Sequence, residues 1–108
     1  MDDDVVVNGV VDELRGFIAS KNLPVDVTTR ENQIILATKT SEKTLTIFCY
    51  AQGQFYLKDT VGNHRGGLQT QATVETVRHS PSGRPFTRSE MLAEANRWLN
   101  EQRPRPRL

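Results

Sequence analysis

The sequence predicts one α+β domain in the order α-β-β-β-β-β-α, an antiparallel five-stranded meander with the N- and C-terminal helices packed on one face. Two segments, at about 8–22 and 87–102, repeat apolar residues at helical spacing. Between them, short runs rich in β-branched and aromatic residues alternate with turn-forming residues. The links between these runs are too short for crossovers, so consecutive strands are expected to pair antiparallel. Both helices then bury their apolar faces against one side of the sheet.

The first helix is expected over about residues 8–22. Its apolar residues recur at spacings of three and four and form one face: Val7, Val10, Val11, Leu14, Phe17 and Ile18. The aspartates at 2–4 would favour the helix dipole from just before the helix, and Asn8 is the expected cap. The helix ends before Pro24, because the residue preceding a proline avoids the helical region.

Five strands are expected, at 25–30, 33–38, 44–50, 53–58 and 69–78, with a glycine-containing loop over 59–68. Alternation divides the side chains of the third and fourth strands between two faces. The face expected toward the helices carries Leu45, Ile47, Cys49, Phe55 and Leu57. The opposite face carries Phe48, Tyr50, Tyr56 and Lys58, and is more aromatic than a merely solvated sheet needs.

The second helix has the clearest start in the chain. Thr87 as N-cap and Glu90 three residues later form a capping box, and Phe86 can pack on Met91 as a hydrophobic staple. Proline prevents the tail 103–108 from continuing the helix, so this segment is expected to be flexible. The folded domain is therefore predicted to span 1–102.

Composition places the chain in the intracellular, globular class. Its 108 residues are 36% hydrophobic and 25% charged, enough for one modest core. No apolar run approaches the roughly 20 residues of a membrane helix. The acidic start is unlike a secretory signal, and a single cysteine excludes an internal disulfide framework. A cytoplasmic or nuclear location is expected.

Catalysis, a metal and a cofactor are not expected. Cys49, His64 and His79 lack the close spacing of a structural zinc site. Ser80 lies next to His79, but nothing in the sequence predicts the strained turn and oriented base of a nucleophile. An enzyme would have to use His64 and the following arginine in the 59–68 loop, and no other feature supports that hypothesis.

The favoured hypothesis is a protein-interaction or regulatory module that binds a protein partner or a second copy of itself. The sheet face and the long loop would form its surface, with Phe48, Tyr50, Tyr56, Lys58, His64 and Arg65 as the candidate residues. Aromatic patches of this kind usually mark contacts between molecules.

The alternative hypothesis is nucleic-acid binding. Residues 1–54 carry eight acidic and five basic side chains, a net charge of −3, whereas residues 55–108 carry five and nine, a net charge of +4. Basic side chains would bind phosphates while a tyrosine of the sheet stacks on bases, and Lys58 and Arg78 are the basic residues expected near the aromatic rings. The candidate basic residues are Lys58, Arg65, Arg78, Arg84, Arg103, Arg105 and Arg107.

Overall fold

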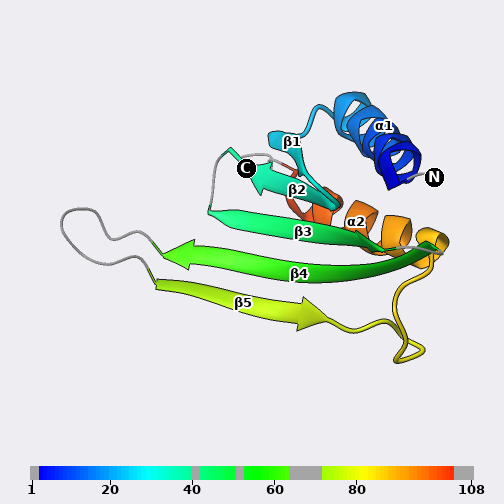
Figure 1. Cartoon of the computed structure of the whole chain (residues 1–108). Coiled ribbons are helices and arrows are strands. Elements are labelled where there is room, and N and C mark those ends of the chain that lie inside the picture. Colours follow the sequence, from blue (N-terminus) through cyan, green and yellow to red (C-terminus); the bar gives the residue numbers. More distant parts are fainter. Residues whose placement is uncertain (1–2, 40–41, 51–52, 64–71, 104–108) are drawn as a thin grey trace.

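The computed structural model of this chain describes residues 3–39, 42–50, 53–63 and 72–103. The elements are helix α1 (Asp3–Lys21), strands β1 (Val25–Arg30), β2 (Gln33–Thr38), β3 (Lys43–Tyr50), β4 (Gln54–Asn63) and β5 (Ala72–Arg78), and helix α2 (Arg88–Glu101). The strands form one sheet in the order β1-β2-β3-β4-β5, each antiparallel to the next (Figure 1). The predicted α+β meander is confirmed.

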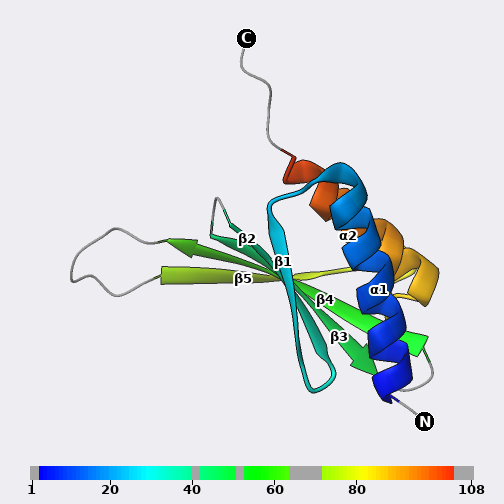
Figure 2. The ribbon, with the colours of Figure 1, turned by 90° about the horizontal axis from the view of Figure 1, so that it is seen from above.

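Both helices cover the same face of the sheet, and no other described element covers the opposite face (Figures 1 and 2). The helices lie side by side, and an ion pair between Glu13 of α1 and Arg88 of α2 links them. Alternation along the strands directs one set of side chains into the core under the helices. All five strand residues predicted for this core are buried: Leu45, Ile47, Cys49, Phe55 and Leu57. The same core takes in Leu14 from α1 and Trp98 from α2.

Helix α2 begins with the predicted capping box. The hydroxyl of Thr87 accepts a hydrogen bond from the backbone N–H of Glu90 at 3.2 Å, and the Glu90 carboxylate accepts one from the Thr87 N–H at 3.0 Å. Two N–H groups that the helix leaves without partners are thereby satisfied. This start orients the buried face of α2, which consists of Met91, Ala95, Trp98 and Leu99.

Loss of this cap is expected to destabilise the domain measurably. Thr87→Ala removes the side-chain acceptor and should lower the free energy of unfolding by about 1 kcal/mol. The melting temperature should fall by about 4–8 °C in a domain of this size. Thr87→Ser keeps the hydroxyl and is the matched control. Thermal unfolding followed by circular dichroism tests this, and equal melting temperatures for the two variants would contradict it.

Two predicted boundaries were wrong. Helix α1 begins at Asp3 rather than near Asn8, so Asn8 lies inside the helix and does not cap it. The extra turn allows Val7 to pack into the core, and acidic residues are compatible with a first turn because of the helix dipole.

Strand β4 continues to Asn63, through five residues predicted as loop. Strand β5 is described from Ala72, and the predicted strand residues 69–71 lie outside the described ranges. The extension is paired on both sides, because Asp59 lies opposite Leu45 of β3 and opposite Thr76 of β5. Pairing with two neighbouring strands outweighs the weak strand preference of aspartate and glycine. The predicted loop residues 64–68 lie outside the described ranges.

Candidate functional site: the open sheet face

The candidate site is the sheet face opposite the helices, here called the open face. It is formed by alternate residues of neighbouring strands, and its central members are Ile35, Thr46, Phe48, Tyr50, Tyr56, Lys58 and Val77. Their neighbours along each strand, such as Leu36, Ile47 and Leu57, point into the core. The four sheet residues predicted from alternation, Phe48, Tyr50, Tyr56 and Lys58, therefore do lie together on this face.

Three aromatic side chains occupy one end of the open face. Phe48 and Tyr56 are direct cross-strand neighbours, and the rings of Tyr50 and Tyr56 meet edge to face with centroids 5.0 Å apart. Such a contact contributes about 0.5–1.5 kcal/mol beyond the burial of area. The two tyrosines are nevertheless 46% and 43% exposed. They contact each other and still leave nearly half of their surface exposed to solvent.

Lys58 links this aromatic end to the edge of the sheet. Its ammonium group lies 5.6 Å from the centroid of the Phe48 ring, within the range of a cation–π contact. The same group lies 3.4 Å from the carboxylate of Glu75 on β5. Lys58 is therefore already engaged by a ring and by a carboxylate, and its charge is largely balanced.

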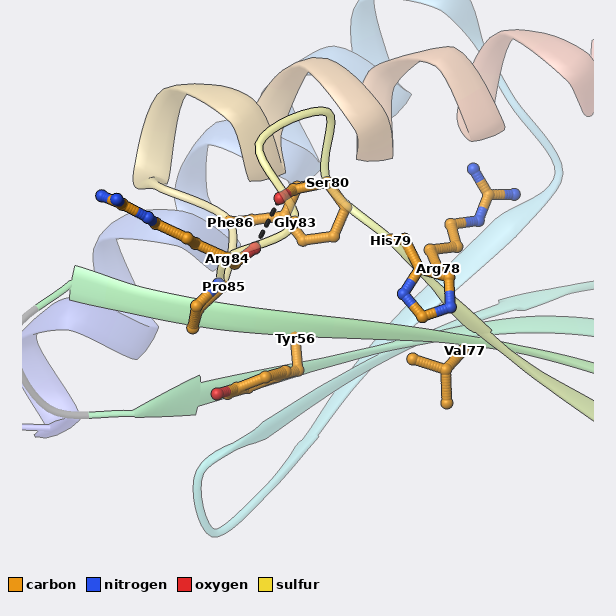
Figure 3. A pocket seen from close by; sticks show the side chains of 9 residues that line it. All are labelled: Tyr56, Val77, Arg78, His79, Ser80, Gly83, Arg84, Pro85 and Phe86. Carbon is orange, nitrogen blue, oxygen red and sulfur yellow. Dashed lines mark hydrogen bonds between the residues drawn. The ribbon is translucent and has the colours of Figure 1, made fainter.

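A pocket opens beside Tyr56 where the chain leaves β5 and returns to the edge of β4 (Figure 3). Phe86 exchanges two backbone hydrogen bonds with Phe55, at 3.0 and 2.9 Å, so the chain between Arg78 and Phe86 must loop outward. The pocket has a volume of about 260 Å³. Its lining consists of Tyr56, Val77, Arg78, His79, Ser80, Gly83, Arg84, Pro85 and Phe86.

The turn that borders this pocket is stabilised by interactions among its own residues. The buried hydroxyl of Ser80 donates a hydrogen bond to the Arg84 carbonyl at 2.5 Å, and Gly83 adopts a φ of 77°, which favours glycine. Tyr56 and Val77 supply apolar walls, and the imidazole of His79 supplies a polar group. Serine, proline and glycine in residues 80–85 favour a turn here, but no sequence signal shows that it borders Tyr56.

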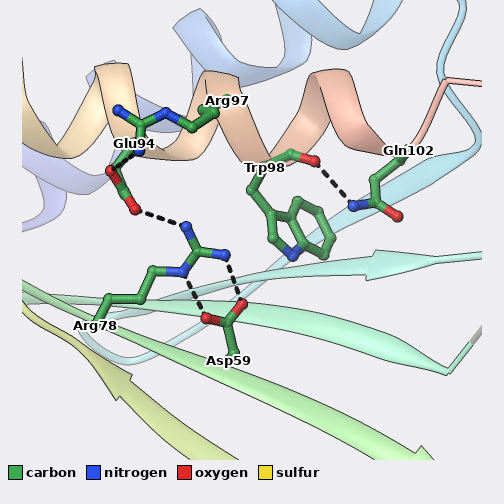
Figure 4. Close-up of polar contacts among 6 residues, drawn as sticks. All are labelled: Asp59, Arg78, Glu94, Arg97, Trp98 and Gln102. Atoms are coloured by element: carbon green, nitrogen blue, oxygen red, sulfur yellow. Dashed lines mark hydrogen bonds and ion pairs between the residues drawn. The ribbon is translucent and has the colours of Figure 1, made fainter.

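Arg78 does not lie on the open face, contrary to the expectation that it would neighbour the aromatic rings. Its position opposite Leu57 directs the side chain to the helix side, between β4 and α2 (Figure 4). The guanidinium donates to both carboxylate oxygens of Asp59, at 2.5 and 2.9 Å, and to Glu94 at 2.7 Å. The hydrogen bond with Asp59 is the main cause that raises the pKa of Arg78, and burial opposes this shift. Two carboxylates thus neutralise this cation.

Two other predicted cations fall within the described ranges, on different parts of the fold. Arg84 is exposed at the rim of the pocket, and Arg103 is exposed just after α2. His64, Arg65, Arg105 and Arg107 lie outside the described ranges. The structure therefore brings the predicted aromatic residues and Lys58 together, and it does not bring Lys58, Arg78 and Arg103 into one patch.

Two further properties of the described residues bear on the class of the protein. Within 3–39, 42–50, 53–63 and 72–103, no three His, Cys, Asp or Glu side chains come close enough to share a metal ion. In the same ranges, neither helix has the length and apolar character needed to span a bilayer.

A scan against protein-family models, a search of curated proteins and a search of solved structures each found no match to this chain. A function can therefore be inferred only from the geometry and chemistry of the open face.

Proposed function

We propose that this domain is a non-catalytic protein-interaction module whose open face binds a protein partner or a second copy of itself. The observation that carries the proposal is the pair of exposed tyrosines, set edge to face beside Phe48 on a sheet face that no helix covers. Tyrosine is enriched in protein interfaces, because it gives a large contact area and a hydrogen-bonding group at little cost in conformational entropy.

The surroundings of the tyrosines support the same proposal. The strands below them are fixed by a packed core, so the surface is preorganised and loses little freedom on binding. The adjoining pocket at Val77 and Pro85 can receive one projecting side chain of a partner. A pocket at the margin of a flat aromatic surface is a suitable place for an anchor residue.

Among the described residues, the placement of charge favours a protein over a nucleic acid. Affinity for nucleic acid comes mainly from cations that contact phosphates along a continuous path. Here Arg78 is neutralised on the helix side, and Lys58 lies against Glu75. The exposed Arg84 and Arg103 are attached to different parts of the fold.

The proposal is tested by removing the aromatic surface without disturbing the core. Tyr50→Ser combined with Tyr56→Ser should raise the Kd for a purified partner at least tenfold, or about 1.4 kcal/mol. The partner is first captured from nuclease-treated extract on the wild-type chain, then purified and titrated calorimetrically. Asn100→Ser combined with Glu101→Ser, on the exposed surface of α2, is the matched control and should bind as the wild type does.

Two outcomes would count against the proposal. One is a captured protein that binds the tyrosine variant as tightly as the wild type. The other is tight binding of single- or double-stranded oligonucleotides in fluorescence anisotropy, with the steep salt dependence that counterion release causes. Self-association through the face is tested separately, because Tyr56→Ala should then lower the mass measured by light scattering at high concentration.

A further inference from the structure

The backbone of β5 presents hydrogen-bonding groups to solvent along the edge of the sheet. On β4, Phe55 bonds to Phe86 on the side away from β3, whereas Gly62 donates to Glu42 on the side of β3 at 2.7 Å. Because these directions alternate along a strand, the odd-numbered residues of β4 bond toward β5 and the even-numbered ones toward β3.

The register of β5 against β4 then shows, for each residue of β5, whether its backbone groups point toward β4 or outward. Val74 and Thr76 lie opposite odd-numbered residues of β4 and bond to them. Thr73, Glu75 and Val77 point their N–H and C=O groups outward. Among the described residues, no hydrogen bond is made by the outward groups of these three. A strand edge of this kind is a template for another strand.

Little in the sequence of β5 blocks such pairing. The opposite edge strand, β1, is preceded by Pro24, and Arg15 of α1 donates to the Val27 carbonyl at 3.4 Å. Strand β5 contains no proline and no lysine, and its carboxylate, Glu75, lies against Lys58. Proline, lysine and a covering element are the usual means by which edges avoid association. Among the residues described, the edge at β5 has none of them.

Apolar side chains are exposed on both sides of this edge. Val74 is 63% exposed and lies opposite Val61 on the helix side of the sheet, beyond the helices. Val77 is also exposed, on the open face near Tyr56. A partner lying flat on either face would cover one valine and leave the other in water. A strand lying alongside β5 alternates its side chains between the two faces and reaches both.

We propose that β5 pairs antiparallel with β5 of a second copy, about a two-fold axis at Val74, so that two five-stranded sheets join into one of ten strands. The inference concerns the edge of the sheet and does not depend on what covers the open face. A two-fold contact uses the same surface on both copies, and each copy here offers the same outward groups and the same exposed valines.

The choice of axis follows from the side chains that each register brings together. Outward-pointing residues must face outward-pointing residues, which leaves a small set of registers. An axis at Glu75 would set two carboxylates directly opposite each other, and like charges there are destabilising. An axis at Thr76 would set Glu75 against the partner's Val77. An axis at Val74 packs Val74 against the partner's Val74 and sets Glu75 against the partner's Thr73, whose hydroxyl can donate to the carboxylate.

This axis also gives a closer contact than an axis at Glu75. Val74 belongs to the set that does not exchange hydrogen bonds across the new pair, where opposite Cα atoms lie about 4.5 Å apart and side chains are nearest. The contact is short, so the dimer should be weak, with a Kd of about 1–100 µM.

The test compares two substitutions at one position. Glu75→Pro and Glu75→Ala both remove the carboxylate, but only proline removes the outward N–H, and neither touches a hydrogen bond to β4. Analytical ultracentrifugation should show a concentration-dependent wild-type dimer, and a Kd for Glu75→Pro at least tenfold above that of Glu75→Ala. The same tenfold difference between Glu75→Pro and Glu75→Ala should persist when Tyr56→Ala is added to each, which separates this edge from the open face.

A cysteine experiment tests the axis and does not require the proline variant to fold. Val74→Cys should form a disulfide-linked dimer on mild oxidation, since its expected Cα separation suits a disulfide. Val77→Cys should not form such a dimer, because this register places residue 77 far from residue 77 of the second copy. The native Cys49 is buried. Wild-type protein that stays monomeric to about 1 mM, where association is worth only 4.1 kcal/mol, would overturn the proposal. Equal Kd values for Glu75→Pro and Glu75→Ala, or faster cross-linking through Val77→Cys, would do so as well.

Discussion

Replacing Phe55 with alanine is expected to lower the free energy of unfolding by about 3–5 kcal/mol. Phe55 is fully buried, and its ring belongs to the cluster that contains Met91 and Trp98 of α2. Removing the ring would leave a cavity that the surrounding sheet and helices can fill only in part. Since a domain of this size is stable by only about 5–15 kcal/mol, the variant should approach the unfolding threshold.

Urea unfolding followed by circular dichroism measures this effect. Phe55→Leu retains most of the volume and should cost less than about 1.5 kcal/mol. The backbone of residue 55 keeps its bonds to Phe86 in both variants, so their difference reports the packing of the ring. An alanine variant as stable as the leucine variant would show that Phe55 is not at the centre of the core.

Replacing Arg78 with methionine is expected to destabilise the domain by about 3 kcal/mol, because it leaves the Asp59 carboxylate without its cation and leaves Glu94 paired only with the more exposed Arg97, at 3.0 Å. The side chains of Arg78, Asp59 and Glu94 are 18%, 25% and 17% exposed, so water can solvate the remaining charges only in part. Methionine preserves much of the apolar stem of arginine, and the loss therefore reports charge and hydrogen bonding more than volume.

Two controls separate these contributions in urea unfolding at pH 7. Arg78→Lys keeps the charge but cannot bind Asp59 with two parallel N–H groups, so its stability should be intermediate. Adding Asp59→Asn and Glu94→Gln to Arg78→Met removes both carboxylate charges and should recover more than half of the loss. A loss below about 0.5 kcal/mol for Arg78→Met alone would place this cluster among ordinary surface ion pairs.

The raised pKa of Arg78 fixes the direction of its pH dependence. A cation whose folded-state pKa lies above its unfolded value contributes stability that is fully present below the unfolded value. That contribution is lost only as the pH rises through the folded-state pKa. Arginine stays protonated throughout the accessible alkaline range, so the difference between wild type and Arg78→Met should not shrink between about pH 7 and pH 10.

Local pattern was sufficient to assign the side chains of the third and fourth strands to the correct faces of the sheet. Side chains alternate between the faces of any strand, so Ile47 and Phe48 had to point in opposite directions once the segment was recognised as a strand. The same reasoning placed Tyr50, Tyr56 and Lys58 together on the open face. The capping box at Thr87 was equally local, because its hydrogen bonds join residues within one helical turn.

Prediction failed where a residue's environment depended on distant segments. Arg78 was expected beside the aromatic rings because it is basic and close to them in the topology. Its direction was set by the register of β5 against β4, which places it on the same side as Asp59. The residues after Asp59 were interpreted as loop from their glycines, whereas pairing with β3 and β5 makes them strand.

The sequence by itself determined the order of the elements, the antiparallel meander, most of the core and the aromatic residues that share the open face. These follow from periodicity and from short connections, which act within a few residues. Only the tertiary structure decided that Arg78 would meet Asp59 and Glu94, that a pocket would form beside Tyr56, and which residues of β5 would point their hydrogen-bonding groups outward. Each depends on register between separate elements, and the Arg78 contacts join residues 16 and 19 positions apart. Local propensity carries no information about which of the possible registers buries the most apolar surface.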